Sequence, residues 1–146
     1  MKLSVELDRK AFDDVLKTFE ELTPKLKRKV LRPAVRKTAY KLRDQARANA
    51  PKQDGYMAKS IIARVTPAKY RGKGNVAYTI GMDEMMRRPD KTGTAHYPAL
   101  YGYFQELGTK KIAGKHFMWA TLERNAGWVL NNVQNEVLHF IQGYGR

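Results

Sequence analysis

The side chains whose type and spacing best suit binding chemistry are lysines and arginines. Residues 25–73 hold 16 of them and only two carboxylates, Asp44 and Asp54, so this stretch has a net charge of +14. The rest of the chain has 12 basic and 12 acidic residues and is neutral. Charges of one sign repel each other until something neutralises them, which favours contact with a polyanion such as DNA. The alternative interpretation is a solvated face that serves solubility.

A long predicted helix positions most of these charges. Thr23 suits its N-cap and Pro24 its first position, and it runs to about Asn49, before Pro51. One side carries the candidate contacts with DNA or a protein partner, which we call the basic face: Lys25, Lys29, Arg32, Arg36, Tyr40, Arg43 and Arg47. Tyr40 can stack on a base, cover an arginine side chain or contact another subunit. No signature of a base-reading domain accompanies it, so we predict phosphate contact without sequence readout.

The opposite side of this helix is predicted to pack inward. Its residues are Leu31, Val35, Thr38, Leu42, Ala46 and Asn49. Pro33 removes a hydrogen bond from the helix interior at a cost of about 3 kcal/mol. The helix therefore either kinks there or restarts at that residue.

A second basic segment lies between two predicted strands, Ser60–Thr66 and Asn75–Gly81. Its candidate contacts are Lys69, Arg71 and Lys73. A third strand is predicted at Lys2–Leu7, where apolar and polar residues alternate. These strands and helices together predict the α+β fold class, with a small antiparallel sheet packed against the long basic helix and a C-terminal helix.

Two further helices and one loop complete the predicted organisation. The first helix begins after Asp8, a suitable N-cap, and the last runs from about His116 to Gln142. The apolar stripe of the last helix starts with Trp119 and Leu122. Residues 82–97 show no periodicity and are predicted to form a mobile loop. The length of 146 residues fits a single domain, residues 1–146.

Sequence patterns for catalysis or metal binding are lacking. The three histidines are far apart without carboxylates at metal-ligand spacing, and the two serines lie in no nucleophile motif. There is no cysteine for a disulfide or a thiolate metal site. No apolar run is long enough to span a membrane, and Met1–Lys10 lacks the apolar core of a signal peptide. We therefore predict a protein that is not an enzyme, has no catalytic residue, cofactor or metal, and is made and kept in the cytoplasm.

Residues 98–109 combine aromatic side chains, one carboxylate and a Gly-Thr pair. Pro98 suits the first position of a short helix and Gly108 a left-handed C-terminal cap. One face of this helix consists of Leu100, Phe104 and Leu107. Glu106 stands between Phe104 and Leu107, so we expect it to be partly buried and paired with an arginine or lysine of the long helix.

A family motif can be read from Tyr103, Phe104, Glu106, Gly108, Thr109 and Phe117, with Ala50-Pro51, Asp54-Gly55 and Lys59-Ser60-Ile61 upstream. In these short motifs the chain resembles a family of tailed-phage proteins known as minor tail, tail-completion or neck proteins. The resemblance runs in order and spacing from Leu26 to the end. The chain departs from the family at Asp54, where threonine is usual, at Met57, where leucine is usual, and at Lys115-His116, where the family has Arg-Pro.

The resemblance implies a structural virion protein of a long-tailed phage. It would be a tail-completion or neck component at the head–tail junction that assembles as a ring. Its partners would be other neck or tail proteins, further copies of itself and the DNA that passes through the channel, with no membrane. It would reside in the virion and, before assembly, in the host cytoplasm. The alternative from a different class is a non-specific cytoplasmic DNA-binding protein without a role in assembly.

Overall fold

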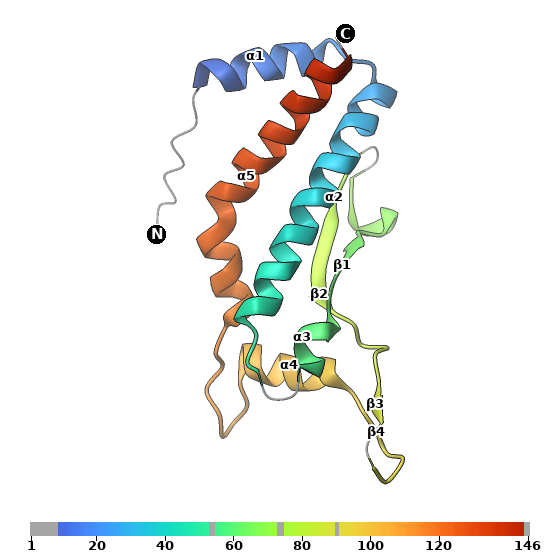
Figure 1. Cartoon of the computed structure of the whole chain (residues 1–146), viewed down its shortest axis with the longest axis vertical. Helices are drawn as coiled ribbons and strands as arrows, with labels where there is room; N and C mark the ends of the chain where they lie inside the picture. Colours follow the sequence, from blue (N-terminus) through green and yellow to red (C-terminus); the bar gives the residue numbers. More distant parts are fainter. Residues whose placement is uncertain (1–8, 53–54, 73–74, 90, 145–146) are drawn as a thin grey trace. The chain divides into compact units, whose positions relative to one another are not determined.

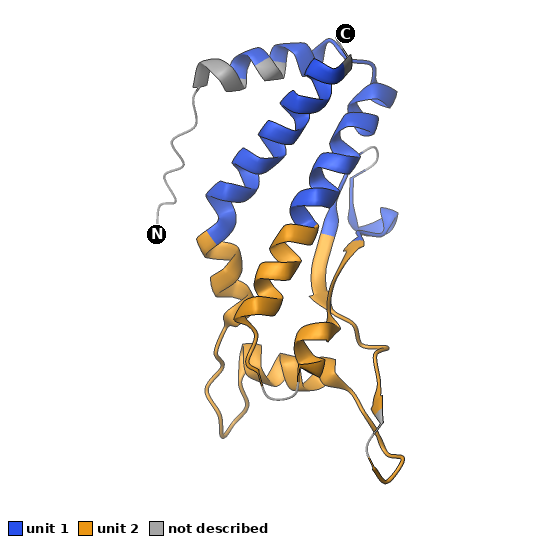
Figure 2. Ribbon diagram, in the orientation of Figure 1, with its two compact units in different colours: residues 1–39, 65–78, 125–146 blue, residues 40–64, 79–124 orange. Residues whose placement is uncertain are grey.

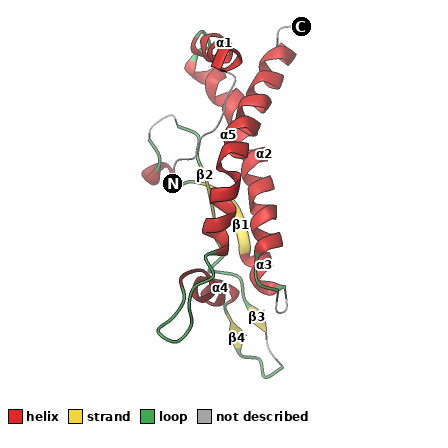
Figure 3. Ribbon diagram, turned by 90° about the vertical axis from the view of Figure 1, so that its left-hand side faces the viewer, coloured by secondary structure: helices red, strands yellow, loops and turns green. Residues whose placement is uncertain are grey.

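The computed structural model describes residues 9–52, 55–72, 75–89 and 91–144. Its elements in chain order are α1 (Arg9–Glu20), α2 (Pro24–Asn49), α3 (Tyr56–Ser60), β1 (Ile61–Val65), η1 (Ala68–Tyr70), β2 (Tyr78–Met82), β3 (Arg88–Pro89), β4 (Ala95–His96), α4 (Pro98–Leu107) and α5 (Phe117–Tyr144) (Figure 1). Figure 3 shows that helices dominate and that the strands are short. The predicted α+β class, with a long helix and a C-terminal helix, is confirmed. The predicted strand Lys2–Leu7 lies outside the described residues.

The chain divides into two compact units (Figure 2). The expectation of a single domain over residues 1–146 stays a prediction. Unit 1 comprises residues 1–39, 65–78 and 125–146, and unit 2 comprises residues 40–64 and 79–124. The helices α2 and α5 each contribute to both units.

In unit 1, the first part of α2 and the last part of α5 run antiparallel beside each other (Figure 1). Val30, Ala34 and Val137 are its buried core residues. Partly buried side chains pack around them: Phe19, Leu22, Leu31, Val133, Leu138, Phe140 and Ile141. Phe19 of α1 and Leu22 of the turn after it thus share the core of α2 and α5.

In unit 2, the core gathers residues from six elements and one connection. Its buried members are Ala46, Ala50, Met57, Ile61, Met82, Ala99 and Phe117. Ile61, the first residue of β1, is completely buried. Strands β1 and β2 pair in a two-stranded antiparallel sheet, as predicted, and the N–H of Asp83 donates to the carbonyl of Ser60 at 2.7 Å where β2 ends.

The inward side of α2 differs from the predicted one. Thr38, Leu42 and Ala46 are buried as expected, but Leu31 and Val35 are only half-buried and Asn49 is exposed. The other buried positions of the segment are Val30, Ala34, Ala39 and Ala50. The helical wheel gave weight to large side chains, whereas the structure buries alanines, which permit a close approach of neighbouring elements.

Helix α2 is continuous from Pro24 to Asn49 with Pro33 inside it, so the helix does not restart there. The Pro33 ring is exposed. On that side water can bond the carbonyl group that the missing N–H leaves without an intrahelical partner.

The predicted loop 82–97 contains regular structure that its composition did not reveal. Strands β3 and β4 pair antiparallel, with Arg88 opposite His96 and Pro89 opposite Ala95. Gly93 adopts a φ of +80° in the turn between them, a conformation that glycine takes without strain. The mobility of this segment stays a prediction.

Candidate DNA or partner interface

The part of the basic face in unit 1 is open to solvent. The exposed residues there are Lys25, Lys29, Arg32 and Arg36. From Pro24 to Arg43 the chain has no acidic residue, so no carboxylate of the helix itself offsets these charges. The arrangement can contact phosphates along one side of a helix.

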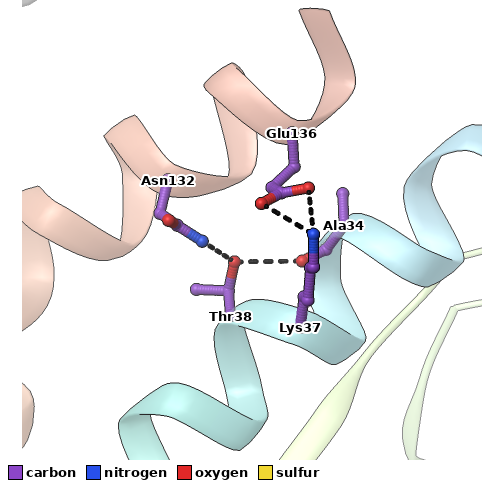
Figure 4. Close-up of polar contacts among 5 residues, drawn as sticks. All are labelled: Ala34, Lys37, Thr38, Asn132 and Glu136. Carbon is purple, nitrogen blue, oxygen red and sulfur yellow. Dashed lines mark hydrogen bonds and ion pairs between the residues drawn. The ribbon is translucent and has the colours of Figure 1, made fainter. Parts of the chain in front are cut away.

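Polar contacts between α2 and α5 fix which side of α2 faces outward in unit 1. Figure 4 shows the buried Thr38 hydroxyl donating to the Ala34 carbonyl at 3.0 Å and accepting from the Asn132 amide at 2.7 Å. Beside it, Lys37 Nζ lies 3.2 Å from a carboxylate oxygen of Glu136 (Figure 4). Lys37 therefore faces α5, which leaves the basic face on another side of α2.

The part of the basic face in unit 2 is more enclosed. The Arg43 guanidinium forms an ion pair of 2.8 Å with Asp44 and lies 4.7 Å from the centre of the Tyr40 ring. Of the three roles considered for Tyr40, covering an arginine is the one that the structure displays. Asp44 also offsets the charge of Arg43, so this pair offers less to a polyanion than the residues of unit 1.

Arg47 differs most from its predicted place on an exposed face. Its Nε donates to the Ile61 carbonyl at 2.8 Å, and a terminal nitrogen donates to the Lys59 carbonyl at 3.4 Å. The guanidinium thus ties the end of α2 to the junction of α3 and β1. A wheel projection could not reveal this, because these acceptors are carbonyls of another element.

The tip between β1 and β2 presents part of the second basic segment. Tyr70 is 72% exposed, and Lys69 Nζ lies 4.6 Å from the centre of its ring. Arg71 donates to the Asn75 carbonyl at 3.3 Å, which holds the turn in place. Lys73 lies outside the described residues.

The carboxylate of the family motif caps a helix. Glu106 Oε2 accepts from the backbone N–H of Met118 at 2.8 Å, and Oε1 accepts from that of Trp119 at 3.0 Å. These amides belong to the first turn of α5, where N–H groups have no intrahelical acceptor and the helix dipole favours negative charge. The expected pairing of Glu106 with a basic residue of α2 is wrong, because among the described residues no ion pair includes Glu106. The two backbone amides donate the hydrogen bonds that stabilise its carboxylate instead.

Glycines bring the end of α4 and the loop before α5 into close contact. Gly108 has φ +82° and ψ −178°, a region open essentially only to glycine. The predicted positive φ is confirmed, although ψ differs from that of a left-handed cap. A Cβ on Gly108 would lie 2.5 Å from the nitrogen of Gly114, and a Cβ on Gly114 would lie 2.6 Å from the carbonyl of Glu106. The loop can fold back against α4 only with glycine at both positions.

The other motif residues support the same region of unit 2. The Thr109 hydroxyl accepts from the N–H groups of Lys111 and Ile112, and Phe117 is buried in the core. The Tyr103 hydroxyl donates to Glu84 at 3.0 Å. Burial raises the pKa of the Tyr103 phenol above its ordinary value, and the Glu84 carboxylate raises it further. These observed contacts assign structural roles to the motif.

The outward side of α4 is a feature that sequence reasoning missed. Leu100, Phe104 and Leu107 were grouped on one face, but that face is exposed. The buried residues of α4 are Pro98, Ala99 and Gly102. The signal that could have revealed this was the absence of any charge but Glu106 between Pro98 and Leu107, since an apolar helix on a protein surface indicates a contact.

Neither a metal centre nor a membrane span is evident in the part of the chain that the structure describes. No group of three or more histidine, aspartate or glutamate residues there could hold a metal ion. None of the described helices is long and apolar enough to cross a bilayer.

Comparison with known proteins gives one match. A family model described as "Bacteriophage HK97-gp10, putative tail-component" matches residues 13–108. The match includes α2, the four strands and α4, and ends at Gly108. Neither a curated protein nor a solved structure matches the chain.

Proposed function

We infer a place at the head-proximal end of the tail from one premise: the chain belongs to the HK97-gp10-like family of bacteriophage tail components. A tail component works in the virion, with other tail proteins as its neighbours. We propose specifically a tail-completion or neck protein that assembles as a ring at the head–tail junction. Before assembly it resides in the host cytoplasm. Its role is structural rather than enzymatic.

The observation that carries this proposal is the exposed, acid-free part of the basic face in unit 1. DNA leaves the head through the junction, and a ring there surrounds a polyanion. Lys25, Lys29, Arg32 and Arg36 offer four positive charges along one helix side, in a stretch without carboxylates. Such a side suits phosphate contact that is independent of sequence, as a passing genome requires.

The motif residues support a structural role. Glu106 caps α5, Gly108 and Gly114 permit the loop between α4 and α5, and Arg47 joins α2 to β1. These polar groups serve the fold of unit 2. The side chains left for contact with other molecules are basic or apolar, which suits assembly with a polyanion and with other subunits.

Charge reversal on the basic face tests the proposal. Lys25→Glu combined with Arg32→Glu changes two exposed residues on one side of α2. We expect phage carrying this pair to accumulate unjoined heads and tails in electron micrographs. In vitro, the slope of DNA affinity against salt should fall by about 0.9 per lost phosphate contact.

The matched control is Lys52→Glu with Arg124→Glu, which makes the same change of net charge at exposed positions outside the basic face. It should leave both readouts unchanged. Normal joining and an unchanged salt slope in the Lys25/Arg32 variant would show that the basic face is only a solvated surface. A reduced slope with normal joining would favour the non-specific DNA-binding protein instead.

A further inference from the structure

Helix α4 turns its small residues inward and its large residues outward. Leu100 is 54% exposed and Leu107 71% exposed, while the neighbouring Gly102 is buried. Gly102 has to be small, because a Cβ there would collide with the sulfur of Met82 in the core. The orientation of α4 is thus fixed by packing. Its large apolar side chains remain on the surface, where a contiguous patch of this kind marks an interaction site.

A hollow of about 520 Å³ opens beside α4 within unit 2, and we call it the aromatic hollow. Its lining includes Tyr56, Arg88, Tyr97, Leu100, Tyr101 and Phe104. None of the described lining residues carries a carboxylate. The hollow therefore combines apolar walls with positive charge.

Further cations lie over the rings that form these walls. The Arg88 guanidinium lies 5.0 Å from the centre of the Tyr56 ring, with Lys59 Nζ at 5.4 Å from the same ring. Arg87 lies 5.7 Å from the centre of the Tyr97 ring. A complementary occupant has apolar side chains for the walls and carboxylates for these cations.

The N-terminal segment of this same chain has that chemistry. Leu3, Val5 and Leu7 alternate with polar residues, and Glu6 and Asp8 supply carboxylates. Residues 1–8 hold one basic and two acidic residues, Lys2, Glu6 and Asp8, a side-chain charge of −1 in a chain whose total is +14. In an extended chain alternate side chains point to opposite sides, so Leu3, Val5 and Leu7 share one side, which suits the apolar walls, and Glu6 and Asp8 share the other.

We propose that the aromatic hollow of one subunit receives the N-terminal segment Met1–Asp8 of a second copy. The proposal rests on the ring inferred above and names the contact that links its neighbours. Such a contact joins two different surfaces, so it repeats from subunit to subunit and can close a ring. A symmetric contact of two hollows would instead bring Arg88 of one copy against Arg88 of the other.

A peptide-binding experiment with the full-length chain tests the hollow. Leu3→Ser, Val5→Ser and Leu7→Ser together remove the apolar groups of the segment and leave the hollow intact. A fluorescent peptide of residues 1–8 should bind this variant in an anisotropy titration. Adding Phe104→Ala or Arg88→Glu should weaken that binding at least tenfold. Adding Leu130→Ser, which changes an exposed leucine in unit 1, should leave it within twofold.

Mixing two variants tests whether the segment and the hollow belong to different copies. The triple-serine variant keeps its hollow, and the Arg88→Glu/Phe104→Ala variant keeps its segment. Native mass spectrometry should find each variant alone as a monomer and their mixture as one-to-one dimers. All changed side chains of the hollow are exposed, and circular dichroism verifies that both variants fold.

Three results would overturn the proposal. They are a peptide that fails to bind, binding that is indifferent to Phe104 and Arg88, and a mixture that stays monomeric, the last of which indicates docking within one copy or onto another tail protein. The inferred place in the virion would survive these results if the same variants still joined heads to tails. Normal joining in the basic-face variant, with dimers still formed by the two mixed variants, would instead refute the inferred place in the virion and leave the docking intact.

Discussion

Glu106 caps the first turn of α5 from the last turn of α4, through a hydrogen bond of 2.8 Å from the Met118 N–H to its carboxylate. A second bond, from the Trp119 N–H, uses the other carboxylate oxygen. The loop between the two helices is held by backbone bonds as well, since Lys115 donates to the Gln105 carbonyl at 2.7 Å and His116 to that of Glu106 at 3.2 Å. The family motif thus encodes a helix–loop–helix joint.

Removing the cap should destabilise the protein. Glu106→Ala leaves two amides of α5 without their acceptor, and loss of an N-cap acceptor costs about 0.5–2 kcal/mol. We expect a loss of about 2 kcal/mol in urea denaturation, because the acceptor is charged and makes two bonds. Glu136→Ala removes an exposed ion pair instead and should cost less than about 1 kcal/mol. Equal losses in the two variants would contradict the cap.

The glycines of the joint should tolerate no side chain. Gly108→Ala places a Cβ 2.7 Å from the Ile112 carbonyl at a positive φ, and Gly114→Ala places one 2.7 Å from the backbone of Leu107. Each should cost more than about 1 kcal/mol, from strain and from the displaced loop. Gly143→Ala in α5 meets no atom within 4 Å and should be neutral or stabilising. Thermal melting of the three variants checks this prediction. A Gly108→Ala variant with the same melting temperature as the parent would refute the tight joint.

Arg47 should behave as a residue of the fold, unlike the exposed members of the basic face. Arg47→Met keeps the aliphatic stem but removes the bond to the Ile61 carbonyl, and a bond from a charged donor contributes about 1.5–3 kcal/mol. Arg32→Met, at an exposed position, should change the free energy of unfolding by less than about 0.5 kcal/mol. Chemical denaturation distinguishes the two, and a neutral Arg47→Met would place Arg47 back on a functional surface.

Tyr103 should make stability depend on alkaline pH. Because its pKa is raised in the folded protein, first by burial and then by Glu84, the folded state holds the phenolic proton more tightly than the unfolded chain. This contribution is fully present below the ordinary pKa of 10.0 and is lost as pH rises from there through the folded pKa. The parent should therefore lose more stability between pH 9 and pH 11 than Tyr103→Phe does. Identical pH profiles would show that Glu84 and burial do not act on this phenol.

The elements could be predicted from the sequence where one local pattern decides them. Proline at the first position marks α2 and α4, and alternation, with Val76, Tyr78 and Ile80 on one face, marks β2. The hydrogen bonds between threonines and asparagines that join α2 to α5 could be predicted only in part. Thr38 accepts from Asn132, and Asn49 donates to Thr121 at 3.0 Å, but the wheel could show only that Thr38 and Asn49 lie on the packing side.

The features that the sequence did not predict depend on contacts between segments that are distant in the chain. Glu106 was expected to meet a basic side chain, because sequence shows charges but not the amides of a helix that begins eleven residues later. Arg47 was assigned to the solvent side, because its acceptors are carbonyls at Ile61 and Lys59. The outward side of α4 escaped prediction because apolar side chains at helical spacing are ordinarily the buried ones.

The central claim, a place at the head–tail junction, can be tested most directly on whole particles. Purified virions are labelled with gold-coupled antibody against this protein and imaged by electron microscopy. The account predicts gold at the junction between head and tail. Gold along the tail tube or at its distal tip, or unlabelled virions whose protein is also undetected by mass spectrometry, would contradict it.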